Sequence, residues 1–228
     1  MSEKKGEKKY MEYKIILIGN SAVGKTAFFK KITKGVFNER NISTIGVDKS
    51  TLYFKDIEVK SKDVEKKEEF NIILFDTAGQ DRYRSLAKSY FNSTDIVMLI
   101  YDITNKQSFI DIEKWLDDIQ DKLSDWKTGH YVIFLLGNKL DLAKEDGDGN
   151  KREVTEEEAE SICEEKSIYW GGECSCKTFT QEQLNEILLK SFKKYVENFG
   201  IKEDPKKATR LGDLKKKKKV YAKNKNII

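Results

Sequence analysis

The sequence has few of the residues that cross-link small proteins or build the common metal sites. Its 228 residues include three cysteines, one histidine and one proline. An odd number of cysteines in a chain rich in lysine and glutamate favours a reducing, cytoplasmic environment over a disulfide framework. A single histidine excludes sites built from several imidazoles. A single proline excludes proline-rich linkers and recognition tracts.

Long apolar runs are also missing. The longest uncharged ones, at residues 96–101 and 131–136, are far shorter than the roughly 20 residues that a membrane-spanning helix needs. The first residues have no apolar segment of the kind found in signal peptides, and Ser2 stands where myristoylation requires glycine. We therefore expect a soluble protein with one main domain, because a chain of this length can bury a single large core.

Charge is divided unevenly along the chain. Residues 201–228 contain 11 lysine and arginine residues against three acidic ones, whereas the whole chain has a net charge of only +4. We expect residues 1–11 to form a polar arm, residues 12–200 the folded domain, and residues 201–228 a basic tail that is disordered in isolation. The charged residues at 60–69 predict a long hairpin loop between two strands.

Strand-like and helix-like segments alternate between the two polar ends. Short apolar runs predict six strands, at residues 13–18, 50–59, 70–75, 96–101, 131–136 and 167–174. Helical spacing predicts helices at residues 25–33, 84–91, 107–123, 155–166 and 181–199. This alternation indicates an α/β fold with a mostly parallel six-stranded sheet and helices on both faces. Ligands of such sheets bind beyond the carboxyl ends of the strands.

A glycine-containing loop connects the first predicted strand to the first predicted helix. Its sequence from Gly19 to Thr26, Gly-Asn-Ser-Ala-Val-Gly-Lys-Thr, matches the phosphate-binding pattern G-x-x-x-x-G-K-[ST]. The backbone N–H groups of such a loop surround an anion at the positive end of a helix. The Lys25 ammonium can reach the β- and γ-phosphates, and the Thr26 hydroxyl can ligate Mg²⁺. The residues expected to contact the nucleotide here are Ser21, Ala22, Val23, Gly24, Lys25, Thr26 and Ala27.

A second segment, Asp-Thr-Ala-Gly-Gln at residues 76–80, follows the third predicted strand. Asp76 is placed to hold Mg²⁺ directly or through water. Gly79 has no side chain, so its N–H can approach a γ-phosphate, and Gln80 can orient an attacking water. Alone, this segment is equally consistent with an ordinary turn, and its significance comes from the phosphate-binding loop that precedes it.

A third segment, Gly-Asn-Lys-Leu-Asp at residues 137–141, follows the fifth predicted strand. The Asp141 carboxylate can accept hydrogen bonds from the ring N–H and the amine of guanine, whereas adenine offers no such pair of donors on that edge. Asn138 can hold the base beside the phosphate loop, and the Lys139 stem can lie along the base. A backbone N–H for the guanine carbonyl oxygen can come from the segment after the last strand, Ser175, Cys176 and Lys177.

With these segments in order over about residues 12–199, the sequence resembles the small GTPases of the Ras superfamily, and the Rab branch most of all. Rab-like details are Ser-Thr-Ile-Gly-Val-Asp at 43–48, Asp-Arg-Tyr-Arg at 81–84 and Tyr-Asp-Ile-Thr at 101–104. The resemblance implies the three-layer fold of P-loop NTPases and binding of GTP and GDP with Mg²⁺. It also implies hydrolysis of GTP to GDP, slow without an activating protein.

The resemblance implies roles for further residues. Thr44 closes over Mg²⁺ and the γ-phosphate in the GTP state, and Phe37 packs against the base. Two switch segments, at about 37–48 and 79–91, relax when the γ-phosphate is lost. Exchange factors, activating proteins and effectors are expected to bind these switches in the control of vesicle-mediated membrane traffic. The expected catalytic residues are Gln80, Lys25 and Thr44, and the expected metal ligands are Thr26, Thr44 and Asp76.

The sequence departs from the Rab pattern in its tail and on its effector surface. No cysteine follows Cys176, so either the sequence is truncated or the protein reaches membranes in another way than by a prenyl group. The five consecutive lysines from Lys215 to Lys219 contribute about 5 kcal/mol beside an anionic membrane, at roughly 1 kcal/mol each, which predicts only weak contact. Lys49 stands where Rab proteins have an aromatic residue that faces effectors, and Phe75 stands where they have a tryptophan, so effector identity does not transfer.

Two other interpretations stay open. One is a scaffold that holds nucleotide without cycling, which the absent lipidation cysteine favours and Gln80 argues against. The other is a nuclear or nucleic-acid-associated GTPase that acts through its basic tail. Because Tyr221 is the only aromatic residue in that tail, we expect no direct contact with nucleic acid. The leading expectation is a cytoplasmic monomer, with at most peripheral contact with endomembranes.

Overall fold

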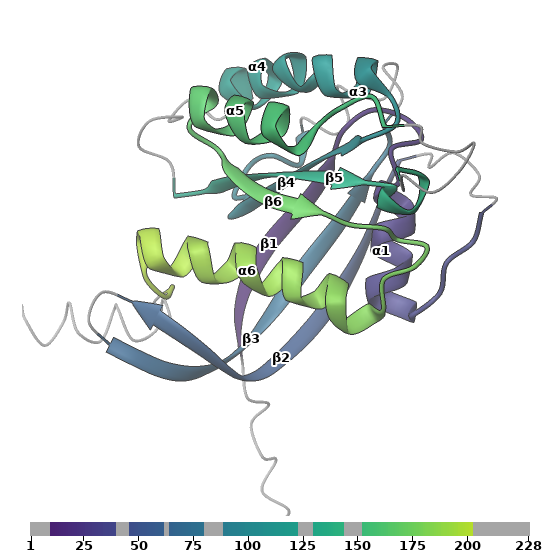
Figure 1. The fold of residues 1–228 in the computed structure, drawn as a ribbon. Coiled ribbons are helices and arrows are strands. Elements are labelled where there is room, and N and C mark those ends of the chain that lie inside the picture. Colours follow the sequence, from purple (N-terminus) through teal and green to yellow (C-terminus); the bar gives the residue numbers. More distant parts are fainter. Residues whose placement is uncertain are drawn as a thin grey trace, which may run out of the picture.

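The computed structural model describes residues 10–39, 46–61, 64–79, 89–122, 130–143 and 152–202. Together they form three layers (Figure 1), with one six-stranded sheet between two layers of helices. The helices and strands are, in order, β1 (Met11–Ile18), α1 (Lys25–Lys34), β2 (Val47–Ser61), β3 (Val64–Thr77), β4 (Ile96–Asp102), α3 (Lys106–Ile110), α4 (Ile112–Lys122), β5 (Val132–Asn138), η2 (Leu140–Leu142), α5 (Glu156–Lys166), β6 (Tyr169–Glu173) and α6 (Gln181–Phe199).

The sheet has the strand order β2-β3-β1-β4-β5-β6. β2 and β3 pair antiparallel, and the remaining neighbours pair parallel. Every residue of β4 and β5 is buried, as their uninterrupted apolar sequences predict for strands covered on both faces. The predicted α/β fold with a mostly parallel six-stranded sheet is therefore confirmed, and the parallel strands direct their carboxyl ends to one edge.

Two apolar cores lie on opposite faces of the sheet. α1 and α6 cover one face, and α3, α4 and α5 cover the other (Figure 1). α5 and α6 each begin at a threonine whose side chain accepts from the third helical N–H, while the Glu or Gln there bonds back to the threonine N–H. Such capping boxes explain why these helices begin where the sequence predicts. No described helix combines the length and the apolarity that crossing a bilayer requires.

The predicted helix at residues 107–123 is in fact two helices, α3 and α4, separated at Asp111. The Asp111 carboxylate accepts hydrogen bonds from Asn20 at 2.7 Å and Lys114 at 2.7 Å. The bond to Asn20 joins residues 91 positions apart in the chain, so apolar periodicity alone did not reveal the break. The predicted helix at 84–91 lies mostly outside the described residues, as does nearly all of the polar arm and the basic tail.

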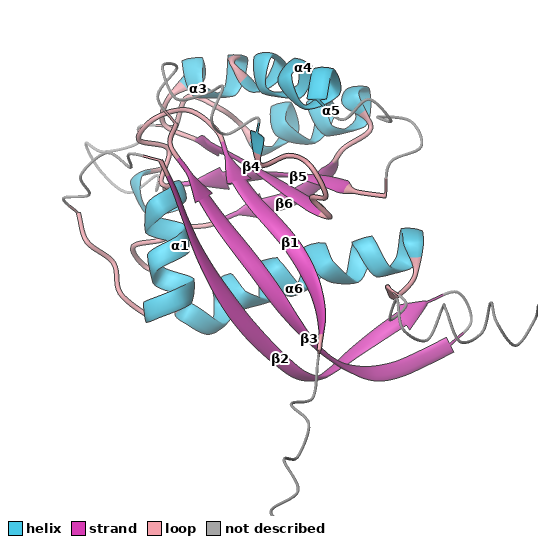
Figure 2. Cartoon of the chain, turned by 180° about the vertical axis from the view of Figure 1, so that it is seen from behind, coloured by secondary structure: helices cyan, strands magenta, loops and turns pink. Residues whose placement is uncertain are grey.

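The predicted loop at residues 60–69 is wrong, because β2 and β3 continue through most of this segment. Glu58 lies opposite Lys67, and Lys60 lies opposite Glu65. Opposite charges facing each other across two antiparallel strands stabilise the pairing. The lysines and glutamates that suggested a solvated loop therefore support a long hairpin, which continues past the other four strands of the sheet (Figure 2).

A β-bulge keeps this hairpin attached to the domain. The register shifts between Phe54 and Ile57, so that β2 gains one residue over β3. Without the extra residue, the following side chains would change faces. With it, Ile57 and Val59 pack into the core that α6 covers, and Val59 is only 2% exposed. Asp56 accommodates the bulge with a φ of 56°.

Candidate functional site

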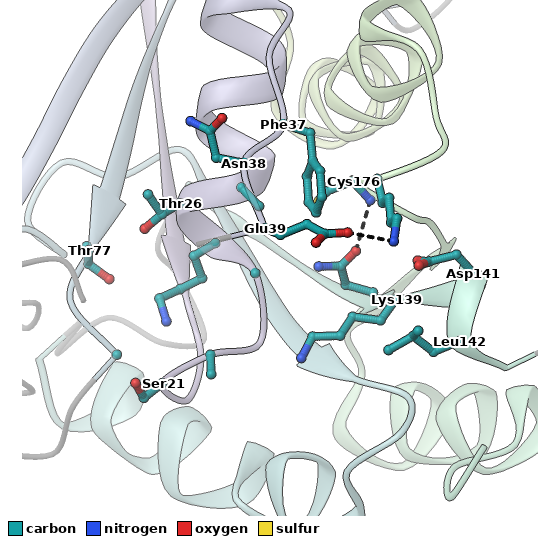
Figure 3. Close-up of a pocket in the computed structure, with 17 residues that line it drawn as sticks. Ser21, Thr26, Phe37, Asn38, Glu39, Thr77, Lys139, Asp141, Leu142 and Cys176 are labelled. Atoms are coloured by element: carbon teal, nitrogen blue, oxygen red, sulfur yellow. Dashed lines mark hydrogen bonds and ion pairs between the residues drawn. The ribbon is translucent and has the colours of Figure 1, made fainter. Parts of the chain in front are cut away.

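A cavity of about 430 Å³ lies where the parallel strands end. Figure 3 shows residues from α1, from the segment after it, and from the loops after β3, β5 and β6 around this cavity. Most of the residues that the sequence predicts for nucleotide binding meet here, although they come from five separate parts of the chain. The cavity is lined by Ser21, Ala22, Gly24, Lys25, Thr26, Ala27, Phe37, Asn38, Glu39, Thr77, Gly79, Asn138, Lys139, Asp141, Leu142, Cys176 and Lys177.

The Lys25 side chain lies across the phosphate-binding loop and is almost completely buried. Its ammonium donates to the carbonyl oxygens of Gly19 and Asn20, each at 2.7 Å. Burial lowers the pKa of Lys25 to about 8, although the Asp76 carboxylate opposes the change. A buried cation beside an open cavity favours the binding of an anion, because the anion offsets the cost of removing the charge from water.

Two glycines keep the cavity open at close backbone approaches. A Cβ atom on Gly24, which has a φ of 105°, would lie 2.1 Å from Nδ2 of Asn138. A Cβ atom on Gly79 would lie 2.2 Å from the Lys25 ammonium and 2.5 Å from the carbonyl oxygen of Asn20. Both positions therefore require glycine, and Gly79 lies directly beside the Lys25 ammonium.

Thr26 and Asp76 meet behind the phosphate-binding loop. The Thr26 hydroxyl donates to Oδ2 of Asp76 at 2.7 Å. The other carboxylate oxygen, Oδ1, is buried and has no hydrogen-bond partner among the described residues. Burial raises the pKa of Asp76 to about 6, while the Thr26 hydroxyl and Lys25 lower it. A hydroxyl and an under-coordinated carboxylate are the oxygen ligands that Mg²⁺ prefers, so these residues fit the predicted metal site.

Asn138 connects the base-binding end of the cavity to the phosphate-binding loop. Its Nδ2 donates to the carbonyl oxygen of Val23 at 2.8 Å, and its Oδ1 accepts from the N–H of Cys176 at 3.3 Å. The residue is only 2% exposed. One side chain thus holds together the loops after β1, β5 and β6. The side chain of Val23 lies in the core, so Val23 takes part through its backbone.

Asp141 is held by Ser175. The buried Ser175 hydroxyl donates to Oδ1 of Asp141 at 2.6 Å and accepts from the N–H of Thr178 at 3.1 Å. A carboxylate has further acceptor positions, so this bond orients Asp141 without using all of its capacity. Lys139 lies between Asn138 and Asp141 in the chain and has a left-handed backbone, with a φ of 72°.

Four residues that line the cavity were not predicted as site residues. They are Asn38, Glu39, Thr77 and Leu142. Glu39 forms an ion pair with Lys177 at 2.8 Å, which joins the segment after α1 to the loop after β6. Both Asn38 and Glu39 directly follow Phe37 and fall within the expected first switch. This position in the sequence could have identified them as residues near the nucleotide. Two predicted catalytic residues, Thr44 and Gln80, lie outside the described residues.

The three-layer fold, the phosphate-binding loop and the cavity define a P-loop nucleotide-binding protein. The chain matches the family model described as Ras family over residues 14–197. It is 36% identical over 158 residues to Ras-related protein Rab-30 from Homo sapiens, covering 69% of this chain and 68% of that protein. The chain therefore belongs to the Ras family of small GTPases, and its Rab-like character is confirmed.

Two further relatives are much longer proteins. The chain is 33% identical to EF-hand calcium-binding domain-containing protein 4B from Homo sapiens over 177 residues, covering 78% of this chain and 21% of that protein. It is also 33% identical to Ras and EF-hand domain-containing protein homolog from Mus musculus, covering 93% of this chain and 31% of that protein. Membership in the family makes this chain a GTPase that binds GTP and GDP and acts with regulators and effectors.

Proposed function

We propose that this GTPase is a Rab-like switch that controls vesicle-mediated membrane traffic. The observation that carries the proposal is the cavity in which the phosphate-binding loop and the base-binding loops meet. The similarity of the chain to Rab-30 supports the Rab type of switch. In this proposal, residues 12–200 form the GTPase domain, which acts as a monomer, and effectors bind the switches at about 37–48 and 79–91 when GTP is bound.

At the phosphate end, we assign the binding of the negatively charged phosphates to a few buried groups. Lys25 binds the β- and γ-phosphates, and the N–H groups of the loop surround them. Thr26 and Asp76, with Thr44, hold Mg²⁺, which neutralises charge on the phosphates when it is bound. Gln80 orients the attacking water. Loss of the γ-phosphate then removes contacts with the switches and changes the surface that effectors bind.

At the base end, we assign recognition of guanine to the loops after β5 and β6. Asp141, held by Ser175 at 2.6 Å, accepts from the two donors of guanine. Asn138, Lys139 and Cys176 surround the base, and Phe37 covers it from the segment after α1. An adenine nucleotide would leave the Asp141 carboxylate without these donors, which is strongly unfavourable in a buried site.

Attachment to membranes is the least usual part of the proposed cycle. The lysines from Lys215 to Lys219 would make a weak electrostatic contact with anionic endomembranes. A stable attachment would need a second signal, such as a bound effector. The alternative, a scaffold that holds nucleotide without hydrolysis, predicts the same cavity but no dependence on Gln80.

The test is single-turnover release of phosphate from the GTP-loaded full chain, with and without the substitution Gln80→Leu. We expect slow release that falls at least tenfold in the variant, because the attacking water is no longer oriented. In cells, a tagged Gln80→Leu chain should gather on vesicle membranes, and Thr26→Asn should stay dispersed. No hydrolysis by the wild type would favour the scaffold, and equal distribution of both variants would contradict a role in traffic.

A further inference from the structure

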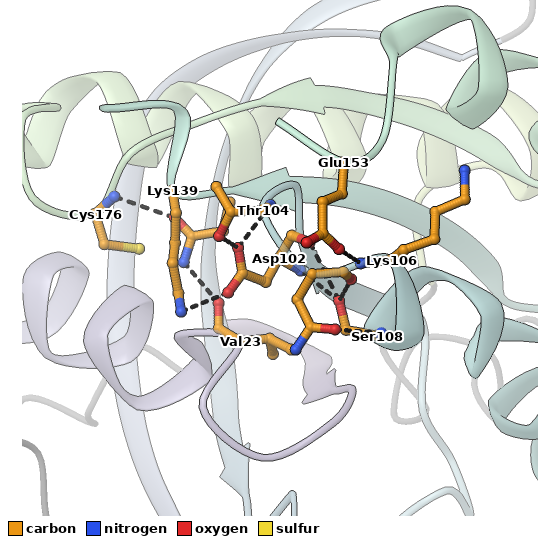
Figure 4. Close-up of polar contacts among 10 residues, drawn as sticks. Val23, Asp102, Thr104, Lys106, Ser108, Lys139, Glu153 and Cys176 are labelled. Atoms are coloured by element: carbon orange, nitrogen blue, oxygen red, sulfur yellow. Dashed lines mark hydrogen bonds and ion pairs between the residues drawn. The ribbon is translucent and has the colours of Figure 1, made fainter. Parts of the chain in front are cut away.

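Asp102, at the carboxyl end of β4, makes a close contact with one of the base-binding residues. Oδ2 of Asp102 lies 2.6 Å from the ammonium nitrogen of Lys139 (Figure 4). Asp102 pairs with Asn138 in the register of β4 and β5, which brings it next to the start of the base-binding loop. Only 6% of Asp102 is exposed. A nearly buried carboxylate therefore holds the charged end of a lysine that lines the nucleotide cavity.

The Asp102 carboxylate is itself held in one orientation. Oδ1 accepts from the N–H of Thr104 at 2.9 Å and from the Thr104 hydroxyl at 2.7 Å. The backbone N–H of Asp102 donates to the Ser108 hydroxyl at 3.0 Å. Both carboxylate oxygens thus have partners, and rotation of the side chain would break at least one of these contacts. The position of the lysine ammonium is set by a carboxylate that is fixed independently of the nucleotide.

The Lys139 side chain gains order from this contact. Lysine has many rotamers in solution, and fixing them has an entropic cost. Its left-handed backbone, rare for a residue with a side chain, directs it between Asn138 and Asp141. Figure 3 shows its stem running along the cavity. With the ammonium fixed at Asp102, the stem is already extended where the flat face of a base would lie, so binding needs less reorganisation.

We propose that Asp102 is a positioning residue for guanine nucleotide: it holds the Lys139 stem along the base and thereby slows nucleotide release. The inference deepens the proposed function and rests on the assignment of Lys139 to the base. It gives a role to the segment Tyr-Asp-Ile-Thr at 101–104, which the sequence singled out without a function. The Thr104 side chain contributes by orienting the carboxylate.

A neighbouring glutamate provides a control for the change of charge. Glu153 accepts from the backbone N–H of Lys106 at 2.6 Å and is exposed. Figure 4 shows it close to Asp102 but on the side away from Lys139. If Asp102 acted only through its negative charge, Glu153→Gln and Asp102→Asn would have similar consequences.

The experiment measures how fast a fluorescent GDP analogue leaves the full chain in excess unlabelled GDP and Mg²⁺. Asp102→Asn keeps the acceptor for Thr104 but turns an amide donor toward the Lys139 ammonium. We expect release to become about tenfold faster, as when one partner of a largely buried charge pair is lost. Glu153→Gln should release the analogue at the wild-type rate.

A double-substitution cycle separates positioning from a structural effect. In a Lys139→Met background there is no ammonium to hold, so adding Asp102→Asn should cause no further acceleration. Equal acceleration by Asp102→Asn in both backgrounds would overturn the proposal, as would a wild-type rate for Asp102→Asn alone. If Lys139→Met itself released the analogue at the wild-type rate, the assignment of Lys139 and this inference would both fall, whereas the hydrolysis test of Gln80 would be unaffected.

A second variant keeps the test decisive if Asp102→Asn does not fold. Thr104→Val preserves the shape of the side chain and removes one hydrogen bond to the carboxylate, which leaves Asp102 less firmly oriented. We expect a smaller acceleration of about twofold to threefold, again absent in the Lys139→Met background. An unchanged release rate for Thr104→Val in such a case would contradict the proposal.

Discussion

The base end and the phosphate end of the cavity are prepared for a ligand in different ways. At the base end, Asn138, Lys139 and Asp141 each have a protein partner within 2.8 Å. At the phosphate end, the charges of Lys25 and Asp76 are buried in surroundings that only partly compensate them, which shifts both pKa values toward the neutral forms. Both ends contain short hydrogen bonds, but at the phosphate end the bonds of Lys25 and Asp76 do not fully offset the burial of their charges.

This difference separates two tasks that one cavity must perform. Recognition of a base needs hydrogen-bond acceptors and apolar side-chain stems in fixed positions. A hydrogen-bond network in which every group has a partner provides that rigidity. Binding of a highly charged phosphate chain needs opposite charge with little water around it, which destabilises the fold until the ligand arrives. We therefore expect substitutions at the base end to change which nucleotide binds, and substitutions at the phosphate end to change how strongly any nucleotide binds.

The largest expected effect is on base selectivity. Asp141→Asn replaces an acceptor with an amide that can donate, which leaves the guanine donors facing another donor. We predict that affinity for GDP falls on the order of 10³-fold, because buried polar groups are left unpaired. Titration calorimetry with GDP measures the loss. Xanthosine diphosphate, which has a carbonyl in place of the amine, is the control and should bind the variant better than it binds the wild type.

A smaller loss of affinity is expected at the phosphate end, and it should not depend on the base. Lys25→Met keeps the length of the side chain but removes its charge and its donors. We predict a fall in GDP affinity on the order of 10²-fold. Combined with Asp141→Asn, the substitution Lys25→Met should lower the affinity for xanthosine diphosphate by the same factor. A loss restricted to one base would contradict the division of the cavity into two ends.

Asn138→Ala tests the base end of the cavity through the stability of the fold. It leaves the carbonyl of Val23 and the N–H of Cys176 buried without the partner that now joins them. We predict that the unfolding free energy of the nucleotide-free protein falls by roughly 2–4 kcal/mol, at about 1–2 kcal/mol for each unsatisfied group. Urea unfolding after removal of nucleotide measures it. Glu153→Gln, whose residue is exposed, is the control and should change stability by less than about 0.5 kcal/mol.

The smallest expected effect is a dependence on pH that comes from Asp76. Its pKa of about 6 in the fold lies above the ordinary value of 3.8, so the folded protein binds this proton more tightly than the unfolded chain does. The stability associated with that proton is present at low pH and is lost as pH rises through about 6. Between pH 4.5 and 6.5 we predict a loss on the order of 1–2 kcal/mol in nucleotide-free wild type.

Comparison with Asp76→Asn isolates this contribution from the other titrating groups. The asparagine cannot titrate, so the unfolding free energy of the variant should lack this part of the decrease between pH 4.5 and 6.5. Asn138→Ala should keep it, because the substitution lies at the base end. Parallel curves for wild type and Asp76→Asn would show that burial of this carboxylate does not strain the fold.

Much of the site could be predicted from the sequence because most of its segments come directly after a strand. Once the alternation of strands and helices predicted a parallel sheet, Gly19, Asp76 and Asn138 had to lie near one edge. What the sequence did not reveal depends on register and on distant partners. Asp102 and Lys139 meet only because β4 pairs with β5 in one particular register, and Glu39 meets Lys177 across most of the chain length.

The error in the hairpin has the same physical origin. Lysine and glutamate are typical of solvated loops, and nothing in a single segment shows that Lys60 will face Glu65 or that Glu58 will face Lys67. At the break between α3 and α4, Asp111 likewise bonds to Asn20, which lies 91 residues away in the chain. Local patterns predicted the elements well, whereas pairings between elements needed the structure.

The most direct test of the difference between the two ends is the unfolding free energy of nucleotide-free Lys25→Met at pH 7. At that pH the buried lysine is charged, because its pKa of about 8 lies above it, and the fold bears the cost of the buried charge. We predict that the variant is destabilised clearly less than Asn138→Ala, because removal of the buried charge offsets the loss of the two hydrogen bonds that the ammonium donates to Gly19 and Asn20, although it binds GDP far more weakly. A variant destabilised as much as Asn138→Ala would contradict the account, because the phosphate end would then be as well satisfied as the base end.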